Sequence, residues 1–281
     1  MTQVVNSIAQ VLQWASLKID RTDARMLLQH ILNVNHAFLL THSNHVLNST
    51  QEKYYSQLVA RRVKGEPIAY LIGECDFYDI TLKVTPDVLI PRPETELLVE
   101  LALKRISSKS NCRILDLGTG CGAIAITIAK HCPQASVIAV DLSSAAVSIA
   151  RKNADIVNVK NVCIAVGNWF SELSEEKFDL IVSNPPYVAE NDPHLFRGDL
   201  RFEPKMALTT ESDGLACIRD IVATACDYLK VDGWLMLEHG YDQAVVCRQL
   251  LKLAGFAKTF SCPDLAGIMR VSGGQYSLSS Q

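Results

Sequence analysis

Four residues, Asn184–Tyr187 with the sequence Asn-Pro-Pro-Tyr, come just after the apolar run Phe178–Val182. An Asn side-chain oxygen and a neighbouring backbone carbonyl can accept hydrogen bonds from both N–H groups of an amide or exocyclic amine. Such a nitrogen is planar and poorly nucleophilic, because its lone pair is shared with a π-system. Holding both N–H groups favours a pyramidal nitrogen and aims the lone pair at an electrophile. The tetrapeptide therefore indicates methylation of a planar nitrogen.

The two prolines add stiffness to this clamp. Pro185 and Pro186 fix φ near about −65° and remove two N–H donors, which leaves the Pro185 carbonyl free to face a substrate. Tyr187 offers a flat apolar wall. We expect Asn184, Pro185 and Tyr187 to be catalytic, and all four residues to hold the substrate. The alternative interpretation is an ordinary turn that ends a strand, since Asn-Pro often begins one.

A glycine-rich loop upstream predicts a cofactor site. The candidate cofactor residues are Gly118, Thr119, Gly120, Cys121 and Gly122. Glycines let the backbone turn tightly where a strand ends and approach a ligand closely. The third glycine comes one residue too early for the dinucleotide fingerprint G-x-G-x-x-G, which favours S-adenosylmethionine over a pyrophosphate cofactor.

Other polar residues follow the neighbouring predicted strands. Asp141 can accept hydrogen bonds from both ribose hydroxyls, or it can cap the helix that follows. Asn168 and Trp169 place an amide and an aromatic plane where an adenine ring would lie, although Trp169 could instead be a core residue. Asp116 could support the loop or meet the methionine ammonium group. Asn184 is expected to contact the cofactor as well as the substrate.

The pattern of apolar residues predicts a small helical domain before a larger α/β domain. Val4–Leu12 and Ala24–Leu32 carry apolar residues at helical spacing, and Ser49–Glu52 predicts a capping box for a third helix. We place this domain at 1–70, a hairpin-like linker at 71–92, and the methyltransferase domain at 93–281.

Strands and helices alternate from Arg113 onward, which is typical of a parallel α/β sheet. We predict a seven-stranded, Rossmann-like class I methyltransferase fold. The expected strands are Arg113–Leu117, Ser136–Val140, Val162–Val166, Phe178–Val182, Trp234–Glu238, Ala257–Ser261 and Ile268–Ser272; the expected helices are 121–131, 143–154, 214–230 and 242–254.

Composition narrows the class of protein. The 281 residues carry a net charge of −3, which argues against duplex nucleic acid as the main partner. Nine cysteines form no C-x-x-C pair and the seven histidines are dispersed, so we predict neither a zinc site nor any other metal. The N-terminus lacks a basic leader and no apolar run reaches membrane-spanning length, so we expect a cytoplasmic protein without membrane contact.

The residues together resemble the protein-(glutamine-N5) methyltransferases that modify class I peptide chain release factors, the HemK/PrmC family. The resemblance spans most of the chain. It is carried by the glycine loop, the Asn184–Tyr187 clamp and three further segments: Gly65–Leu71, Leu89–Glu96 and Arg201–Leu208. The Pro-Arg-Pro-Glu-Thr-Glu sequence within Leu89–Glu96 is the most characteristic of these.

The resemblance implies a function and further site residues. The implied reaction transfers a methyl group from S-adenosylmethionine to the glutamine amide of the release factor's Gly-Gly-Gln motif, which supports translation termination. It also implies that the helical domain helps to dock the factor. We expect the enzyme to be a monomer without a stable nucleic-acid partner. Arg92, Thr95 and Glu96 would lie near the methionine end of the cofactor, or form only a turn and helix start. Glu203 and Pro204 would belong to a loop over the active site, or to a surface turn.

Three alternatives remain open. The same clamp would serve a sister enzyme that methylates a ribosomal-protein glutamine. It would also serve a nucleic-acid methyltransferase acting on an exocyclic amine, for which Arg61, Arg62 and Lys64 form a small basic cluster. A module that binds the cofactor without catalysis is the third. The chain's own Gly273–Gln275 matches the release-factor motif by coincidence, and we interpret it as a turn.

Overall fold

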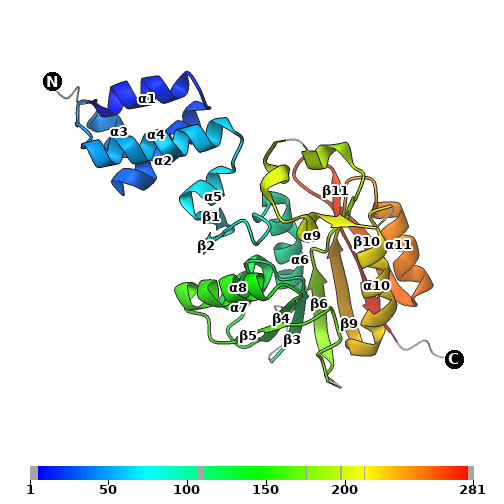
Figure 1. Cartoon of the computed structure of the whole chain (residues 1–281). Coiled ribbons are helices and arrows are strands. Elements are labelled where there is room, and N and C mark those ends of the chain that lie inside the picture. Colours follow the sequence, from blue (N-terminus) through cyan, green and yellow to red (C-terminus); the bar gives the residue numbers. More distant parts are fainter. Residues whose placement is uncertain (1–5, 107–110, 175, 197, 212, 278–281) are drawn as a thin grey trace. The chain divides into compact units, whose positions relative to one another are not determined.

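The computed structural model describes residues 6–106, 111–174, 176–196, 198–211 and 213–277. Contacts divide the chain into two compact units (Figure 1). One comprises Met1–Glu74 with Phe196–Phe202, and the other comprises Cys75–Leu195 with Glu203–Gln281.

The first unit is helical, as predicted. Its helices are α1 (Ile8–Ser16), α2 (Arg21–Leu32), α3 (His36–Thr41), α4 (Ser49–Val63) and α5 (Ile68–Ile72), followed by the short η3 (Gly198–Phe202). Apolar residues at helical spacing, including Ile8, Leu27 and Leu58, form a core of their own. The capping box of α4 was predicted one residue too late. Asn48 is the N-cap, because its side chain accepts the Gln51 N–H while the Gln51 side chain accepts the Asn48 N–H.

Acidic partners neutralise much of the basic cluster on α4. Arg61 forms an ion pair with Glu66, and Arg62 pairs with Asp23 at 2.6 Å and with Asp199 at 3.0 Å. Guanidinium groups paired in this way within the unit are poorly suited to binding phosphates.

The expected hairpin is β1 (Glu74–Phe77) paired with β2 (Ile80–Lys83). The helix α5 precedes this hairpin, and the 3-10 turn η1 (Pro93–Thr95) follows it along the chain. Asn153, which is fully buried, accepts the Lys83 N–H at 2.7 Å and donates to the carbonyls of Lys83 and Cys121. One side chain thus ties the hairpin to the glycine loop.

The second unit contains the predicted seven-stranded sheet. Its strands are β3 (Arg113–Leu117), β4 (Ser136–Asp141), β5 (Val162–Val166), β6 (Phe178–Ser183), β9 (Leu229–Glu238), β10 (Phe256–Pro263) and β11 (Met269–Tyr276). They lie in the order β10-β11-β9-β6-β3-β4-β5, and β11 runs antiparallel to both of its neighbours. The chain starts at β3, builds the sheet outward through β4 and β5, and then returns to β6 on the other side. This reversal creates the switch point at which open α/β sheets bind ligands.

Helices cover both faces of this sheet. The longer ones are α6 (Glu96–Ile106), α7 (Ala123–His131), α8 (Ser144–Val157), α10 (Ala216–Ala225) and α11 (Ala244–Leu253). In Figure 1, α7 and α8 lie on one face, and α10 and α11 lie on the other. The remaining short elements are β7 (Val188–Ala189), η2 (Pro193–Phe196), α9 (Lys205–Leu208), β8 (Thr209–Thr210) and η4 (Cys226–Tyr228).

Two predictions for this unit were wrong. The helix expected at 214–230 ends at Ala225, because Leu229 is buried and already pairs with Phe178 as the first residue of β9. The Gly273–Gln275 triplet is not a turn but part of β11. A Cβ on Gly273 would lie 2.6 Å from the Leu235 carbonyl oxygen and 2.8 Å from the Phe260 ring, so close strand packing requires a glycine there.

Across the described part of the chain, no helix combines the length and apolar character needed to cross a bilayer.

Candidate functional site

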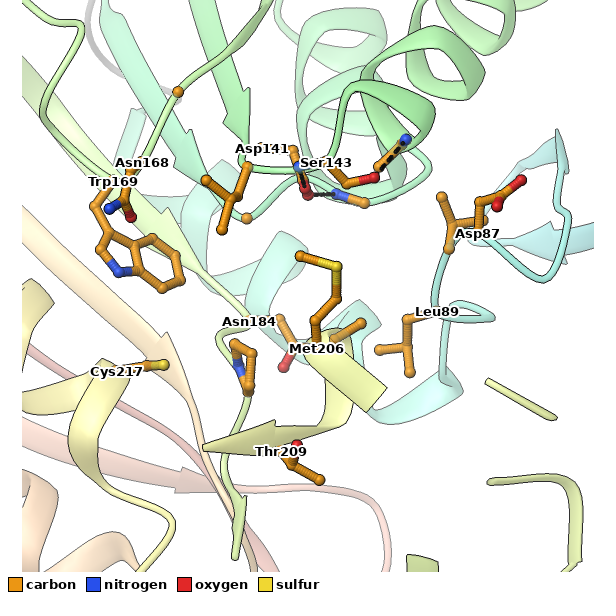
Figure 2. A pocket seen from close by; sticks show the side chains of 18 residues that line it. Asp87, Leu89, Asp141, Ser143, Asn168, Trp169, Asn184, Met206, Thr209 and Cys217 are labelled. Carbon is orange, nitrogen blue, oxygen red and sulfur yellow. Dashed lines mark hydrogen bonds between the residues drawn. The ribbon is translucent and has the colours of Figure 1, made fainter. Parts of the chain in front are cut away.

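A cavity of about 310 Å³ lies where the central strands of the second unit end (Figure 2). Residues at or just beyond the carboxyl ends of β3, β4, β5 and β6 contribute to it, so the cavity occupies the switch point of the sheet. Its lining is formed by Asp87, Val88, Leu89, Gly118, Gly120, Asp141, Leu142, Ser143, Ala146, Gly167, Asn168, Trp169, Asn184, Pro186, Met206, Ala207, Thr209 and Cys217.

The glycine loop brings backbone, rather than side chains, to the cavity. Gly118 has a φ of +71°, and a Cβ there would touch the Trp169 ring at 3.4 Å. Gly122 has a φ of +89° and is the N-cap of α7; a Cβ there would lie 2.6 Å from Ile126 Cδ1. Both positions favour glycine for the left-handed backbone, and Gly122 also needs it for space. Gly118 and Gly120 line the cavity, whereas Gly122 supports the loop from behind.

Asp141 lies at the end of β4 with one loop contact to each carboxylate oxygen. Oδ2 accepts the Gly120 N–H at 2.8 Å, and Oδ1 accepts the Ser143 N–H at 2.9 Å. Burial raises its pKa, and these two N–H groups lower it. Asp141 does not cap the next helix, because the N-cap of α8 is Ser143. Each carboxylate oxygen keeps a lone pair with which to accept a ligand hydroxyl.

Trp169 presents its ring to the cavity from the segment after β5, beside Asn168 (Figure 2). The ring also packs against the hydrophobic core, so the two sequence interpretations of Trp169 are compatible. Its φ of +50° is unusual for a bulky residue and costs on the order of 1–2 kcal/mol. Strain of this kind is concentrated at ligand sites.

Asn184 comes directly after β6 and faces the same cavity (Figure 2). Its Nδ2 group donates to the Thr95 hydroxyl at 3.2 Å, which leaves Oδ1 available as an acceptor. Pro186 also lines the cavity, whereas Pro185 is buried and is not part of the lining. Tyr187 lies outside the lining too; its hydroxyl donates to Glu238 at 3.3 Å, and burial raises its pKa, so it is a neutral phenol.

Two family models match this chain. The family model of the PrmC N-terminal domain matches residues 3–73, and that of the methyltransferase small domain matches residues 94–197. A release factor glutamine methyltransferase of Bordetella pertussis is 49% identical over 91% of this chain and 95% of its own length. One from Xylella fastidiosa is 46% identical over 93% of this chain and 95% of its own length. The chain belongs to the release factor glutamine methyltransferase family.

Solved structures agree on the fold. A methyltransferase from Pyrococcus furiosus superposes with a TM-score of 0.55 at 19% identity, covering 79% of this chain and all of that one. A T. thermophilus 16S rRNA methyltransferase, solved with AdoMet and guanosine, gives a TM-score of 0.53 at 20% identity over 72% of this chain and 49% of that one. Membership of the release factor glutamine methyltransferase family makes this chain a protein-glutamine methyltransferase with the fold expected from its sequence.

Several residues singled out in the sequence lie behind the cavity. Cys121 is buried, which raises the pKa of its thiol to about 12. The Thr119 hydroxyl donates to Asp116 Oδ2 at 2.7 Å, so Asp116 supports the loop from within the core. Burial raises the pKa of Asp116 to about 7.

The Pro-Arg-Pro-Glu-Thr-Glu segment of this chain also supports the site, although its residues do not line the cavity. Arg92 pairs with the buried carboxylate of Glu203, which also accepts the Ile90 N–H at 3.2 Å. Glu96 accepts the Tyr78 N–H at 2.9 Å and so holds the hairpin. Thr95 forms a hydrogen bond with Asn184 of the clamp.

Sequence reasoning missed several lining residues. Most are neighbours of a recognised motif. Leu142, Ser143 and Ala146 follow Asp141, Asp87 to Leu89 precede the Pro-Arg-Pro segment, and Met206 follows Glu203-Pro204. In Figure 2 the Met206 side chain projects into the cavity between Asn184 and the Asp141 side. Cys217 comes from a helix with no motif nearby, and only the folded structure brings it to the site.

Proposed function

We propose that this protein transfers a methyl group from S-adenosylmethionine to the side-chain amide nitrogen of the glutamine in the Gly-Gly-Gln motif of class I peptide chain release factors. The single observation that carries the proposal is that Asn184 of the Asn-Pro-Pro-Tyr clamp shares one cavity with the glycine loop, Asp141 and Trp169. The family membership supports the choice of release factors as substrate.

The residues around the cavity fit the cofactor. A volume of about 310 Å³ is at the lower end of the range of roughly 300–1,000 Å³ found for small-molecule sites. Asp141 would accept from the ribose, the Trp169 ring would face the adenine, and the Gly118–Gly122 loop would lie along the ligand. When bound, S-adenosylmethionine supplies an electrophilic methyl group on a sulfonium.

The clamp would prepare the glutamine amide for attack. Asn184 Oδ1 and the Pro185 carbonyl would accept from the two N–H groups, while Pro186 and Tyr187 would bound the amide. These acceptors favour the positively charged nitrogen of the transition state over the neutral amide. The nitrogen then loses a proton to solvent, and the chain forms no covalent intermediate.

We expect residues 1–70 to dock the release factor, residues 71–92 to link the two domains, and residues 93–281 to catalyse methyl transfer. We also expect the enzyme to act as a monomer in the cytoplasm, without a stable nucleic-acid partner.

The reaction can be tested by incubating the purified protein with S-adenosylmethionine and a mixture of unmethylated release factor, ribosomal proteins and DNA. Mass spectrometry should locate one methyl group on the Gly-Gly-Gln glutamine. A methyl group only on a ribosomal protein or on DNA would contradict the proposed substrate.

Asn184→Ala should lower turnover on the release factor by about 10²–10³, by analogy with the loss of one preorganised hydrogen-bond partner. The affinity for S-adenosylmethionine should change much less. Asn191→Ala, at an exposed position a few residues further on, is the matched control. Near-normal turnover of Asn184→Ala would show that the clamp is assigned wrongly.

A further inference from the structure

Gln243, the residue that precedes α11, is buried against the last residue of the clamp. It is only 8% exposed, and its Nε2 group donates to the Tyr187 carbonyl at 3.1 Å and to the Gly214 carbonyl at 3.2 Å. Its Oε1 atom accepts the Gly240 N–H at 2.8 Å. One amide therefore joins the clamp to two other segments of the second unit, the turn after β9 and the segment before α10.

The partners of this amide allow it only one orientation. A backbone carbonyl can only accept a hydrogen bond, and a backbone N–H can only donate one. The NH₂ group of Gln243 must therefore face Tyr187 and Gly214, while the oxygen faces Gly240. Both hydrogens of the NH₂ group are used in this arrangement.

The turn that carries Gln243 is itself anchored to the sheet. His239 is fully buried, and its Nδ1 atom donates to the Gly240 carbonyl at 2.8 Å, because a carbonyl cannot donate. Its Nε2 atom is then the acceptor for the Ser272 hydroxyl at 2.8 Å, which in turn bonds the Ser261 hydroxyl at 2.7 Å. Burial lowers the pKa of His239, which keeps the ring neutral as this pattern requires. Both backbone groups of Gly240 are thus fixed, and Gln243 has a rigid base.

The clamp depends on such an external hold. Pro185 and Pro186 have no N–H with which to bond the rest of the fold, and their rings fix φ but not ψ. The sheet fixes this stretch at Ser183, where β6 pairs with β3, and Gln243 fixes it at the Tyr187 carbonyl. Glu238 accepts the Tyr187 hydroxyl at 3.3 Å, so both ends of Tyr187 are held by residues that flank the turn after β9.

We propose that Gln243 is a positioning residue for methyl transfer, which holds the Tyr187 carbonyl and thereby keeps the Pro185 carbonyl directed at the substrate amide. This inference rests on the proposed function. Stiff prolines pass a movement of Tyr187 on to Pro185 instead of absorbing it. A misplacement of roughly 1 Å at the reacting groups can cost about 10²-fold in rate. Gln243 does not line the cavity, so it acts only through the clamp.

Gly214 offers an independent way to disturb the same contact. Its φ is +76°, and a Cβ there would lie 2.5 Å from the Tyr187 carbonyl oxygen and 3.0 Å from Gln243 Nε2. Gly214→Ala would therefore push the two partners apart while leaving the Gln243 side chain unchanged. Gly255 has a similar φ of +86°, and a Cβ there would meet no atom of the described residues within 4 Å. Gly255→Ala is thus the matched control for backbone strain.

The first test uses the full chain with Gln243→Met. Methionine has nearly the length of glutamine but no N–H, so it cannot hold the Tyr187 carbonyl. We expect kcat on the release factor, counted per cofactor-binding site, to fall on the order of 10²-fold. The affinity for S-adenosylmethionine should change little. Gln249→Met, at an exposed position of α11, is the control and should keep the wild-type kcat. Wild-type kcat in Gln243→Met would overturn the inference.

The glycine variants decide the matter if Gln243→Met does not fold. In that case kcat should fall strongly in Gly214→Ala and stay near the wild-type value in Gly255→Ala. Equal kcat values in these two variants would overturn the inference, because backbone strain alone would then explain the result.

A measurement without substrate separates this inference from the proposed function. Tyr187-Val188 is the only Tyr-Val pair in the sequence. Labelling the tyrosine carbonyl carbon with ¹³C and the valine amide nitrogen with ¹⁵N therefore isolates the NMR signal of the Tyr187 carbonyl. This signal should move in Gln243→Met and stay in place in Gln249→Met.

The two readouts fail in different ways. If the wild type does not methylate release factors although the Tyr187 signal moves in Gln243→Met, the proposed substrate is wrong but the hold of Gln243 on the clamp stands. A Tyr187 signal that stays in place in Gln243→Met would refute that hold whatever the substrate.

Discussion

At the scale of the single residue, Asp116 links the cofactor loop to the stability of the fold. It is fully buried, Oδ2 accepts the Thr119 hydroxyl, and Oδ1 has no partner among the described residues. Burial raises its pKa from 3.8 to about 7. Between these two values the folded state holds a proton that the unfolded chain has already lost. The free energy of unfolding must therefore fall as pH rises from about 4 to 7.

Asp116→Asn removes this titration and should flatten the pH dependence. One unit of pKa shift corresponds to about 1.4 kcal/mol. The free energy of unfolding of the variant, relative to that of the wild type, should therefore rise by several kcal/mol between pH 5 and pH 8. Urea unfolding at a series of pH values measures the difference. Parallel curves for the two proteins would mean that Asp116 is not protonated in the fold. Burial raises the pKa of Glu238 as well, so Asp116→Asn should lose only part of the wild-type pH dependence.

The site residues that could be predicted from sequence are those that directly follow an apolar strand. Asp141, Trp169 and Asn184 each come just after a predicted strand, and parallel strands bring their carboxyl ends to one edge of the sheet. All three line the cavity. Glu238 also ends a strand, but no motif surrounds it. Its side chain accepts the Tyr187 hydroxyl, and a sequence does not reveal that two residues so far apart along the chain meet.

At the scale of the element, β11 shows how packing can override a local motif. Gly-Gly pairs commonly mark turns, and this interpretation of Gly273–Gln275 was wrong. In the sheet, Gly273 pairs with Met236 and Gly274 with Leu235, while the Gln275 amide donates to the Asp232 carbonyl at 3.0 Å. The strands that flank this triplet come from other parts of the chain, so long-range contacts determine its local structure. The end of α10 was misjudged for the same reason, since Leu229 belongs to the sheet.

Gly273→Ala should destabilise the second unit by about 1–3 kcal/mol, the usual cost of overpacking. The added methyl group would collide with the Leu235 carbonyl and the Phe260 ring. Gln275→Ala, two residues on, is the control. It removes one partly exposed hydrogen bond and should cost about 1 kcal/mol or less. Thermal unfolding of the two variants provides the comparison, and equal losses would argue against tight packing at Gly273. Gln275→Ala should also leave methyl transfer unchanged.

At the scale of the whole molecule, the two units have separate cores. The helical unit buries Ile8, Leu28 and Tyr55 among its own helices, and the core cluster of the second unit draws on the central strands with α10 and α11. Helical periodicity was sufficient to predict the first unit, and alternating strands and helices were sufficient for the second. The boundaries were harder to predict, because Phe196–Phe202 belongs with the helical unit although it lies far along the chain.

Separate cores allow docking and chemistry to be separated by experiment. The cavity and the clamp lie entirely within the second unit, so deleting residues 1–64 should leave the affinity for S-adenosylmethionine nearly unchanged. If the helical unit docks the body of the release factor, the same deletion should abolish methylation of the intact factor. Calorimetry measures the first quantity and mass spectrometry the second. Loss of both would indicate that the second unit no longer folds, whereas undiminished methylation would show that recognition of the factor resides in the catalytic unit itself.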